Sequence, residues 1–427
     1  MSRLIAMGVG LILIGVVCFA HANQMDDVVQ ALILEASEES LEDVESTLLK
    51  LGSVAVDSLI RLLASDDSAL RMTAVRVLGS MDHSIDEKLF QVLRDDRWRV
   101  RVAVVSALAH HQSDRVVIQL LAKLQDAHPA VRAAAARALG RLGNVAAVDS
   151  LILVLQDEKR IVRKSAAKAL GKIKDSRAIG PLIEILQEGG VVQWESMRAL
   201  AHIGQPAVQP LSAIVADGTR SNFFRQIAAK ALREIALLEN EPSVVTSVHA
   251  LGVGLRDSDA GVRQASADAL VIIGKPAADV LRTALLNDPD PEVRAEAATI
   301  FGRSGSARAW YAEAVDMLIL ALVDQEESVR AAAQAALIRI HVIAHGQLVV
   351  ALKDKNPIRR MGVSTVLGAI GHRGSIQPLE TLLKVESDPA VRTSIESALA
   401  LLRTKPSAKM PSRPSPATLK GSRTSGF

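Results

Sequence analysis

The side chains that could do chemistry are few in this sequence, and their spacing rarely suits a shared task. Cys18 is the only cysteine and lies near the N-terminus, so the remainder holds no thiolate nucleophile, disulfide or zinc–thiolate site. His341 and His345 could share one helical face, but no carboxylate lies close to them in sequence. The neighbouring His110 and His111 would point in different directions. We expect no metal site and no cofactor.

Motifs of covalent and phosphate chemistry are missing or isolated. The sequence has no glycine-rich phosphate loop and no Gly-x-Ser-x-Gly. Ser165 and Lys168 form one Ser-x-x-Lys, but its usual companions Ser-Asp-Asn and Lys-Thr-Gly are absent and the stretch has an ordinary helical pattern. We therefore expect no catalytic residue.

Arginine is the chemically distinctive residue that recurs. It follows an apolar residue about every 31 positions, and an aspartate often lies six residues before it. A cation in the first turn of a helix opposes the helix dipole, so each arginine needs a fixed partner. We expect a structural ladder of charge-assisted hydrogen bonds, for example between Asp126 and Arg132; the alternative is a row of anion-binding sites. The pairs are Asp95 and Arg101, Asp126 and Arg132, Asp157 and Arg163, Asp257 and Arg263, Asp288 and Arg294, and Asp324 and Arg330.

The segments around these arginines have helical periodicity. In residues 129–143 the apolar side chains recur at i, i+4, i+7, i+8 and i+11, and Gly140 and Gly143 are expected to end the helix. A second apolar segment follows at 147–155. Only six Phe, three Trp and one Tyr occur, which suits closely packed helices. The repetition predicts an all-α fold, a right-handed α–α superhelix of about 11–12 helix pairs.

The pattern D-x-x-x-x-V-R-x-x-A-x-x-A-L-G resembles the HEAT-like repeats of the phycobilisome (bilin) lyase type over residues 55–403. The resemblance implies a solenoid whose second helices line the concave surface. Those helices carry few charges here, which favours a protein or peptide partner over nucleic acid. The resemblance also leaves two enzyme-associated alternatives, a bilin lyase and an iron-dependent deoxyhypusine hydroxylase. The hydroxylase binds iron through His-Glu dyads, and no His-Glu pair occurs in this sequence.

One unit departs from the repeat. Trp194 and Glu195 stand where the apolar residue and arginine belong, and the preceding aspartate is missing in this unit and the next. The next unit places Phe223 and Phe224 beside its arginine. We expect a partner-binding patch at these four residues; the alternative is a large core side chain at Trp194 and a solvated Glu195.

Two further aromatic positions are candidate partner-binding sites. Trp98 lies between Arg97 and Arg99, where the cations could hold an anion; a solvated turn with one packed Trp is the alternative. Trp310 and Tyr311 end an insertion that begins near position 304, and solenoid insertions often lie on the binding face.

The two ends differ from the repeats. Residues 1–22 have a cationic start, an apolar run and Ala20-His21-Ala22, which predicts a signal peptide for export, with a membrane anchor at 4–20 as the alternative. Residues 23–54 are expected to form capping helices. The segment 404–427 is rich in Pro and Ser, and it holds five cations and no acid although the whole chain carries only +3. It is expected to be disordered and to contact anionic envelope components weakly.

We therefore predict a non-catalytic protein-binding or scaffolding protein that acts in the periplasm or cell envelope. Export contradicts the bilin lyase alternative, because that enzyme needs a cytoplasmic partner.

Overall fold

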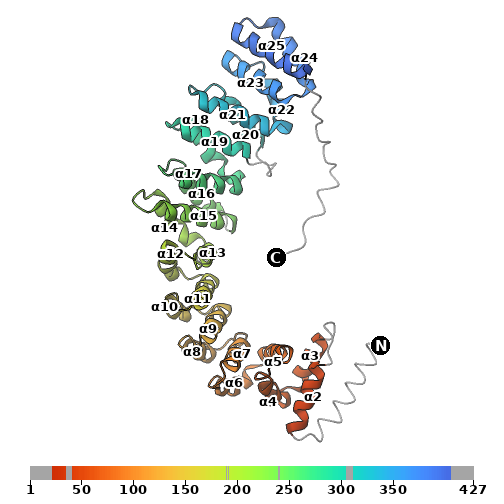
Figure 1. Ribbon diagram of the computed structural model, residues 1–427, viewed down its shortest axis with the longest axis vertical. Coiled ribbons are helices and arrows are strands. Elements are labelled where there is room, and N and C mark those ends of the chain that lie inside the picture. The colour runs from red at the N-terminus through yellow and green to blue at the C-terminus, as the bar shows by residue number, and fades with distance from the viewer. Residues whose placement is uncertain are drawn as a thin grey trace, which may run out of the picture. The chain divides into compact units, whose positions relative to one another are not determined.

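The computed structural model describes residues 22–34, 41–188, 190, 192–238, 241–303 and 311–404. Within these ranges every regular element is a helix (Figure 1). There are 24 α-helices in the described residues, and five short 3-10 helices precede some of them. The predicted fold class, an all-α solenoid of HEAT-like helix pairs, is confirmed.

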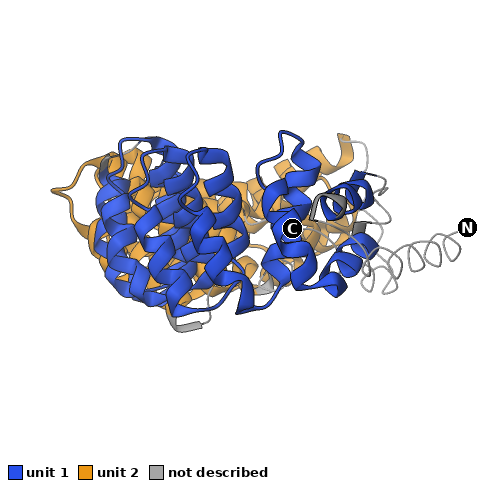
Figure 2. Cartoon of the chain, turned by 90° about the horizontal axis from the view of Figure 1, so that it is seen from below, with its two compact units in different colours: residues 1–207 blue, residues 208–427 orange. Residues whose placement is uncertain are grey.

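The chain divides into two compact units, residues 1–207 and 208–427 (Figure 2). The boundary falls inside one helix, α14 (Gln205–Ala216). Residues 1–21 of the expected signal peptide and residues 405–427 of the expected tail lie outside the described residues. No helix in the described ranges is both long enough and apolar enough to cross a membrane.

Unit 1 consists of two rows of helices from α6 onward, with even-numbered helices in one row and odd-numbered helices in the other (Figure 1). Its helices are α2 (Ala22–Leu34), α3 (Leu41–Leu51), α4 (Ser53–Leu62), α5 (Ser68–Ser80), α6 (Asp86–Val92), α7 (Trp98–Leu108), α8 (Asp114–Lys123), α9 (Pro129–Leu142), α10 (Val148–Val154), α11 (Arg160–Ile173), α12 (Ile179–Glu188) and α13 (Gln193–Ile203), with η2 (His83–Ile85), η3 (Val145–Ala147) and η4 (Ser176–Ala178).

Unit 2 by itself also consists of alternating, mutually packed helices. Its helices after α14 are α15 (Asn222–Leu238), α16 (Glu241–Gly254), α17 (Ala260–Ile273), α18 (Ala278–Asn287), α19 (Pro291–Arg303), α20 (Tyr311–Ala321), α21 (Glu327–Arg339), α22 (His341–Ala351), α23 (Pro357–Ile370), α24 (Ile376–Val385) and α25 (Pro389–Thr404), with η5 (Lys275–Ala277) and η6 (Arg373–Ser375).

The arginine-bearing helices have clear start and stop signals. Asp67 caps α5 by accepting hydrogen bonds from the N–H groups of Ala69 and Leu70. Pro129 opens α9, where a missing N–H costs nothing. Gly143 ends α9 with a φ of 68°, a left-handed conformation that glycine adopts without strain. The expectation for Gly143 is confirmed.

Gly140 has a different role from the one expected. It lies inside α9 rather than at its end. A Cβ at this position would be 2.5 Å from the Cα of Ala169 on α11, so the hydrogen side chain lets the two helices approach closely. Gly171 has the same relation to Ala199 on α13, at 2.7 Å. The recurring Leu-Gly of the sequence therefore marks helix contact between repeats.

The helices pair differently from the expectation, which made the arginine-bearing helix the first member of each pair and the following apolar segment the second. In unit 1, α8 packs on α9 and α10 packs on α11, so the arginine-bearing helix is the second member of each pair. The arginine-bearing helices also pack on one another, α7 on α9 and α9 on α11. The side chains between them, such as Val131, Leu139 and Leu170, are completely buried.

Candidate functional site

The repeat arginines form two kinds of contact at once. The Nη1 atom of Arg132 donates to the main-chain carbonyl of Asp126, 3.0 Å away. Its Nε and Nη2 atoms donate to the two carboxylate oxygens of Asp157, at 2.7 and 2.9 Å. Arg101 does the same with the carbonyl of Asp95 and the carboxylate of Asp126. Each arginine thus joins its own turn to the turn of the following repeat.

The same contacts occur in unit 2. Arg225 binds the carboxylate of Asp257, and Arg294 binds that of Asp324. Near the end of unit 2, Arg360 binds both oxygens of Glu386 at 2.6 and 2.8 Å.

The expected carboxylate partner was therefore wrong by one repeat. Asp126 and Arg132 do not pair through their side chains, because the aspartate six residues before an arginine offers its main-chain carbonyl. The carboxylate comes from 25 residues after Arg132. A distance of six residues was visible in the sequence, whereas the stacking that brings Asp157 to Arg132 was not.

The ladder has gaps. Arg163 donates to the carbonyl of Asp157, but among the described residues no carboxylate lies within ion-pair distance of it. Arg263 and Arg330 likewise donate to the carbonyls of Asp257 and Asp324. The carboxylate of Asp288, which Arg263 would need, is bound by Arg256 instead.

The paired carboxylates titrate below their ordinary range. Burial raises the pKa of Asp126, but hydrogen bonds from Arg101 and from the N–H of His128 outweigh it and hold the pKa below 3.8. Asp157 has its pKa lowered in the same way by Arg132 and the N–H of Lys159. The guanidinium groups of Arg101 and Arg132 already bind protein carboxylates, so these arginines are not available to form a row of anion-binding sites.

The expected aromatic patch is only partly at the surface. Trp194 on α13 is 58% exposed and Phe223 on α15 is 48% exposed, each within its own unit. Phe224 is 1% exposed, so its assignment to a partner-binding surface is wrong; it fills the core beneath α15. Glu195 is not simply solvated, because its carboxylate lies 3.1 Å from the Nζ atom of Lys164.

The cations around Trp98 have partners of their own. Arg97 binds the carboxylate of Asp95 at 2.8 Å, so it does not present a free guanidinium. The Trp98 ring stacks on His128 with centroids 4.1 Å apart, and Arg99 lies over the same indole at 5.4 Å. Trp310 and the side chain of Tyr311 lie outside the described residues.

A groove of about 620 Å³ runs across α5, α7, α9 and α11 of unit 1. Its floor consists of small and apolar side chains such as Ala103, Ala134 and Ala138. Seven cations line it and no acidic residue does; they are Arg71, Arg76, Arg99, Arg137, Arg141, Lys168 and Lys172. The groove lies on the arginine-bearing helices, whereas the segments of the 147–155 type were expected to line the concave surface.

Most of these cations lack a carboxylate. In the described residues only Arg76 has one, that of Glu45 at 2.7 Å. Arg137 at the centre still contacts solvent, but the groove walls desolvate it and lower its pKa, while its Nη1 atom reaches only the hydroxyl of Ser165. Arginine keeps its charge in proteins. The groove therefore holds concentrated, incompletely compensated positive charge.

Sequence reasoning missed this groove although a signal exists. Arg137 and Lys168 are 31 residues apart, and so are His110, Arg141 and Lys172 in turn. The Nη1 atom of Arg141 contacts Nε2 of His110 at 2.5 Å, and burial together with that cation lowers the pKa of His110. Equal spacing places these residues in rows across successive helices, which a search for the apolar pattern alone does not reveal.

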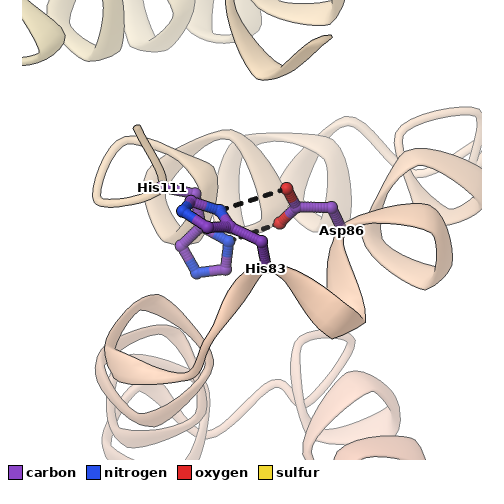
Figure 3. A group of neighbouring side chains, drawn as sticks. All are labelled: His83, Asp86 and His111. Carbon is purple, nitrogen blue, oxygen red and sulfur yellow. Dashed lines mark hydrogen bonds and ion pairs between the residues drawn. The ribbon is translucent and has the colours of Figure 1, made fainter. Parts of the chain in front are cut away.

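A second cluster consists of His83 in η2, Asp86 at the start of α6 and His111 between α7 and α8 (Figure 3). The Nδ1 atom of His111 lies 2.5 Å from Oδ1 of Asp86, and Nδ1 of His83 lies 3.4 Å from Oδ2. The side chains of His110 and His111 were expected to point in different directions. His111 is buried and contacts Asp86, whereas His110 lines the groove. His341 and His345 do not share a site: His341 contacts the carbonyl of Ile338 and His345 the hydroxyl of Ser375.

Comparisons with known proteins agree with the repeated helix pairs described above. A family model described as HEAT repeats matches residues 56–123, 85–158, 117–201, 148–233, 218–299 and 278–347. Several of these matches begin at an even-numbered helix, which agrees with the observed pairing of α10 with α11. No curated protein matches the sequence significantly.

Solved structures that are similar to this chain include karyopherin Kap121p bound to the extreme C-terminus of the protein phosphatase Cdc14p. The two sequences are 15% identical, the TM-score is 0.48, and the match covers 89% of this chain and 50% of that one. Kap121p bound to Nup53p is similar (14%, TM-score 0.47, 89% and 49%), as is an engineered protein (22%, TM-score 0.29, 82% and 99%). The chain spans about half the length of Kap121p. The family matches together extend over residues 56–347, more than half of the sequence, and the chain belongs to the HEAT repeat family.

Proposed function

We propose that this protein is a non-catalytic scaffold that binds an acidic segment of a partner protein in the groove of unit 1. The observation that carries the proposal is the lining of the groove, which holds seven cations and no acidic residue, with Arg137 at its centre and without a carboxylate partner among the described residues. Cations held close together without counter-ions repel one another, and a ligand carboxylate would offset that cost.

The lining of the groove favours a peptide over a nucleic acid. Proteins that bind single strands combine cations with exposed aromatic rings on which bases stack. No Phe, Trp or Tyr lines this groove, and Trp98, which is close in sequence to Arg99, is stacked on His128 instead. The floor of alanine, valine and methionine suits the aliphatic parts of a polypeptide.

A direct test uses a fluorescein-labelled oligoglutamate peptide and anisotropy at low ionic strength. The wild-type chain should bind it, and affinity should fall as salt is added, because exposed charges are screened. Arg137→Glu combined with Lys168→Glu should weaken binding by about tenfold or more, since each lost contact of about 1.4 kcal/mol is a factor of ten.

The matched control is Arg160→Glu on the same helix as Lys168. Arg160 is exposed and does not line the groove, so binding should be unchanged. Oligolysine and an oligothymidylate of equal charge are the ligand controls. Equal binding of the oligothymidylate would point to a nucleic-acid partner, and equal losses in both variants would remove the groove from the interface.

We further propose that the protein acts outside the cytoplasm, in the periplasm or cell envelope. This part of the proposal is supported by the apolar run and small-residue pattern of residues 1–22. N-terminal sequencing of the protein from fractionated native cells tests it: a start at or near Asn23 outside the cytoplasm is expected. An intact Met1 on a cytosolic protein would contradict export and return the lyase alternative.

A further inference from the structure

We propose that His83, Asp86 and His111 form a binding site for a divalent transition-metal ion, with Zn²⁺ as the ion that fits the ligand set. The ligand atoms of the three residues all lie within 4.8 Å of one another. The site is in unit 1 and shares no residue with the cationic groove. The inference is therefore independent of the proposed scaffold function.

The repeat itself shows that this cluster is unusual. Positions 86, 117, 148 and 179 are equivalent, each three residues before a fully buried leucine. The other three hold Val117, Val148 and Ile179, all buried. A buried aspartate in an aliphatic position costs stability unless its charge is compensated. Packing therefore does not account for Asp86.

The position of His111 is exceptional in the same way. The equivalent residues 31 and 62 positions later are Leu142 and Ile173. The side chain of His111 is 1% exposed and turns toward Asp86. An aspartate at the start of α6 and a histidine between α7 and α8 have thus replaced aliphatic residues at two positions whose side chains are in contact.

The hydrogen bonds of His111 prepare it to be a ligand. Its Nε2 atom lies 2.9 Å from the main-chain carbonyl of Leu78, which can only accept, so Nε2 carries a hydrogen. This leaves Nδ1 as the atom that faces the carboxylate of Asp86. A histidine that donates its other N–H to a carbonyl is the usual arrangement around protein-bound metals.

The third group completes the set from the solvent side. His83 is exposed, and its Nδ1 atom lies near the second oxygen of Asp86. A buried ion pair would need only His111 and Asp86, so it gives no reason for this second imidazole (Figure 3). Tetrahedral Zn²⁺ with bonds of about 2.0–2.2 Å takes nitrogen and carboxylate ligands and accepts water as a fourth ligand.

The experiment is a titration of the tag-free, EDTA-treated full chain with ZnCl₂ by calorimetry, followed by CoCl₂ with visible absorption. We expect one Zn²⁺ per chain at micromolar or lower concentration and intense visible bands for tetrahedral Co²⁺. His83→Ala removes a surface ligand without disturbing the buried pair. It should weaken Zn²⁺ binding by more than about tenfold, since even residues behind the ligands change affinity by 10–100-fold.

Two further variants keep the result interpretable. Asp86→Asn keeps the shape of the side chain and should also weaken binding, with circular dichroism checking that the helices persist. His372→Ala is the matched control, because His372 and His345 also form a close imidazole pair, with ring centroids 4.3 Å apart. Absence of stoichiometric binding to the wild-type chain, or binding lost with His372→Ala and kept with His83→Ala, would overturn the proposal.

Discussion

At the scale of single residues, repeat arginines such as Arg101 and Arg132 are stabilising because each makes a main-chain and a side-chain contact together. Only a guanidinium has donors in a fixed fork that can hold a carbonyl and both oxygens of a carboxylate. The sequence showed the arginine, its period and its need for a partner. The correct carboxylate followed only from stacking, because it belongs to the next repeat.

The contribution of the carboxylate can be separated from that of the carbonyl. Arg132 has both contacts, whereas Arg163 donates to a carbonyl and has no carboxylate partner among the described residues. Arg132→Ala should lower the free energy of unfolding by about 1–3 kcal/mol, since it also leaves Asp157 unpaired. Arg163→Ala should cost less. Urea denaturation of both variants measures the difference, and equal losses would mean that the carboxylate adds nothing.

The ion pair between Arg360 and Glu386 predicts that stability depends on pH. Hydrogen bonds from Arg360 lower the pKa of Glu386 from 4.5 to about 2. Because the folded-state pKa is the lower one, the stabilisation is present above pH 4.5 and is lost as the pH falls toward 2. The carboxylate is 2% exposed, yet it is covered mainly by Arg360 and its own turn near the surface, so solvent screening reduces the effect to about 1–2 kcal/mol.

Comparison of the wild-type chain with Glu386→Gln isolates this group from the other carboxylates. The variant should be less stable at neutral pH, and the difference in unfolding free energy should shrink between pH 4.5 and pH 2. Urea denaturation curves over this pH range measure it. A difference that stays constant with pH would show that Glu386 does not titrate in this window.

At the scale of elements, a glycine in several arginine-bearing helices sets how closely neighbouring repeats approach. Gly140→Ala would place a methyl group against the main chain of Ala169, which cannot move without separating α9 from α11. We expect a loss of about 1–3 kcal/mol, typical of overpacking. Gly346 inside α22 has open space around it, so Gly346→Ala should be neutral or stabilising by up to about 1 kcal/mol. Thermal unfolding of the two variants should shift in different directions or by clearly different amounts.

The helices and their period could be predicted from the sequence. Which face of each helix packs on which neighbouring helix could not. Apolar spacing identifies helices such as α9, and Gly143 marks its end. The same spacing does not say whether α10 pairs with α9 or α11, because both faces of α9 are apolar. The cationic groove and the buried pair of Asp86 and His111 depend on that choice, and for this reason sequence reasoning did not find them.

At the scale of the whole molecule, each of the two units is a stack in which neighbouring repeats contact one another. Stability in such an array is approximately a sum of repeat and interface terms, so a weak interface lowers the cost of local opening nearby. In unit 1 the interfaces of α7 with α9 and of α9 with α11 carry an arginine–aspartate bridge. The interface of α11 with α13 has instead the Lys164–Glu195 pair, whose lysine is half exposed.

The interface between α11 and α13 should therefore be the weaker place in unit 1. Its helices still pack closely at Gly171 and Ala199, so α13 is helical and buried, but an exposed ion pair adds little to hold it. We expect the amides of α13 to exchange with deuterium about tenfold faster than those of α9, which corresponds to about 1.4 kcal/mol in opening free energy. Hydrogen–deuterium exchange read by mass spectrometry on peptides from both helices measures this. Arg132→Ala should bring α9 toward the exchange rate of α13, because it removes the same kind of bridge. Equal protection of α9 and α13 in the wild-type chain would show that apolar packing alone sets the strength of these interfaces.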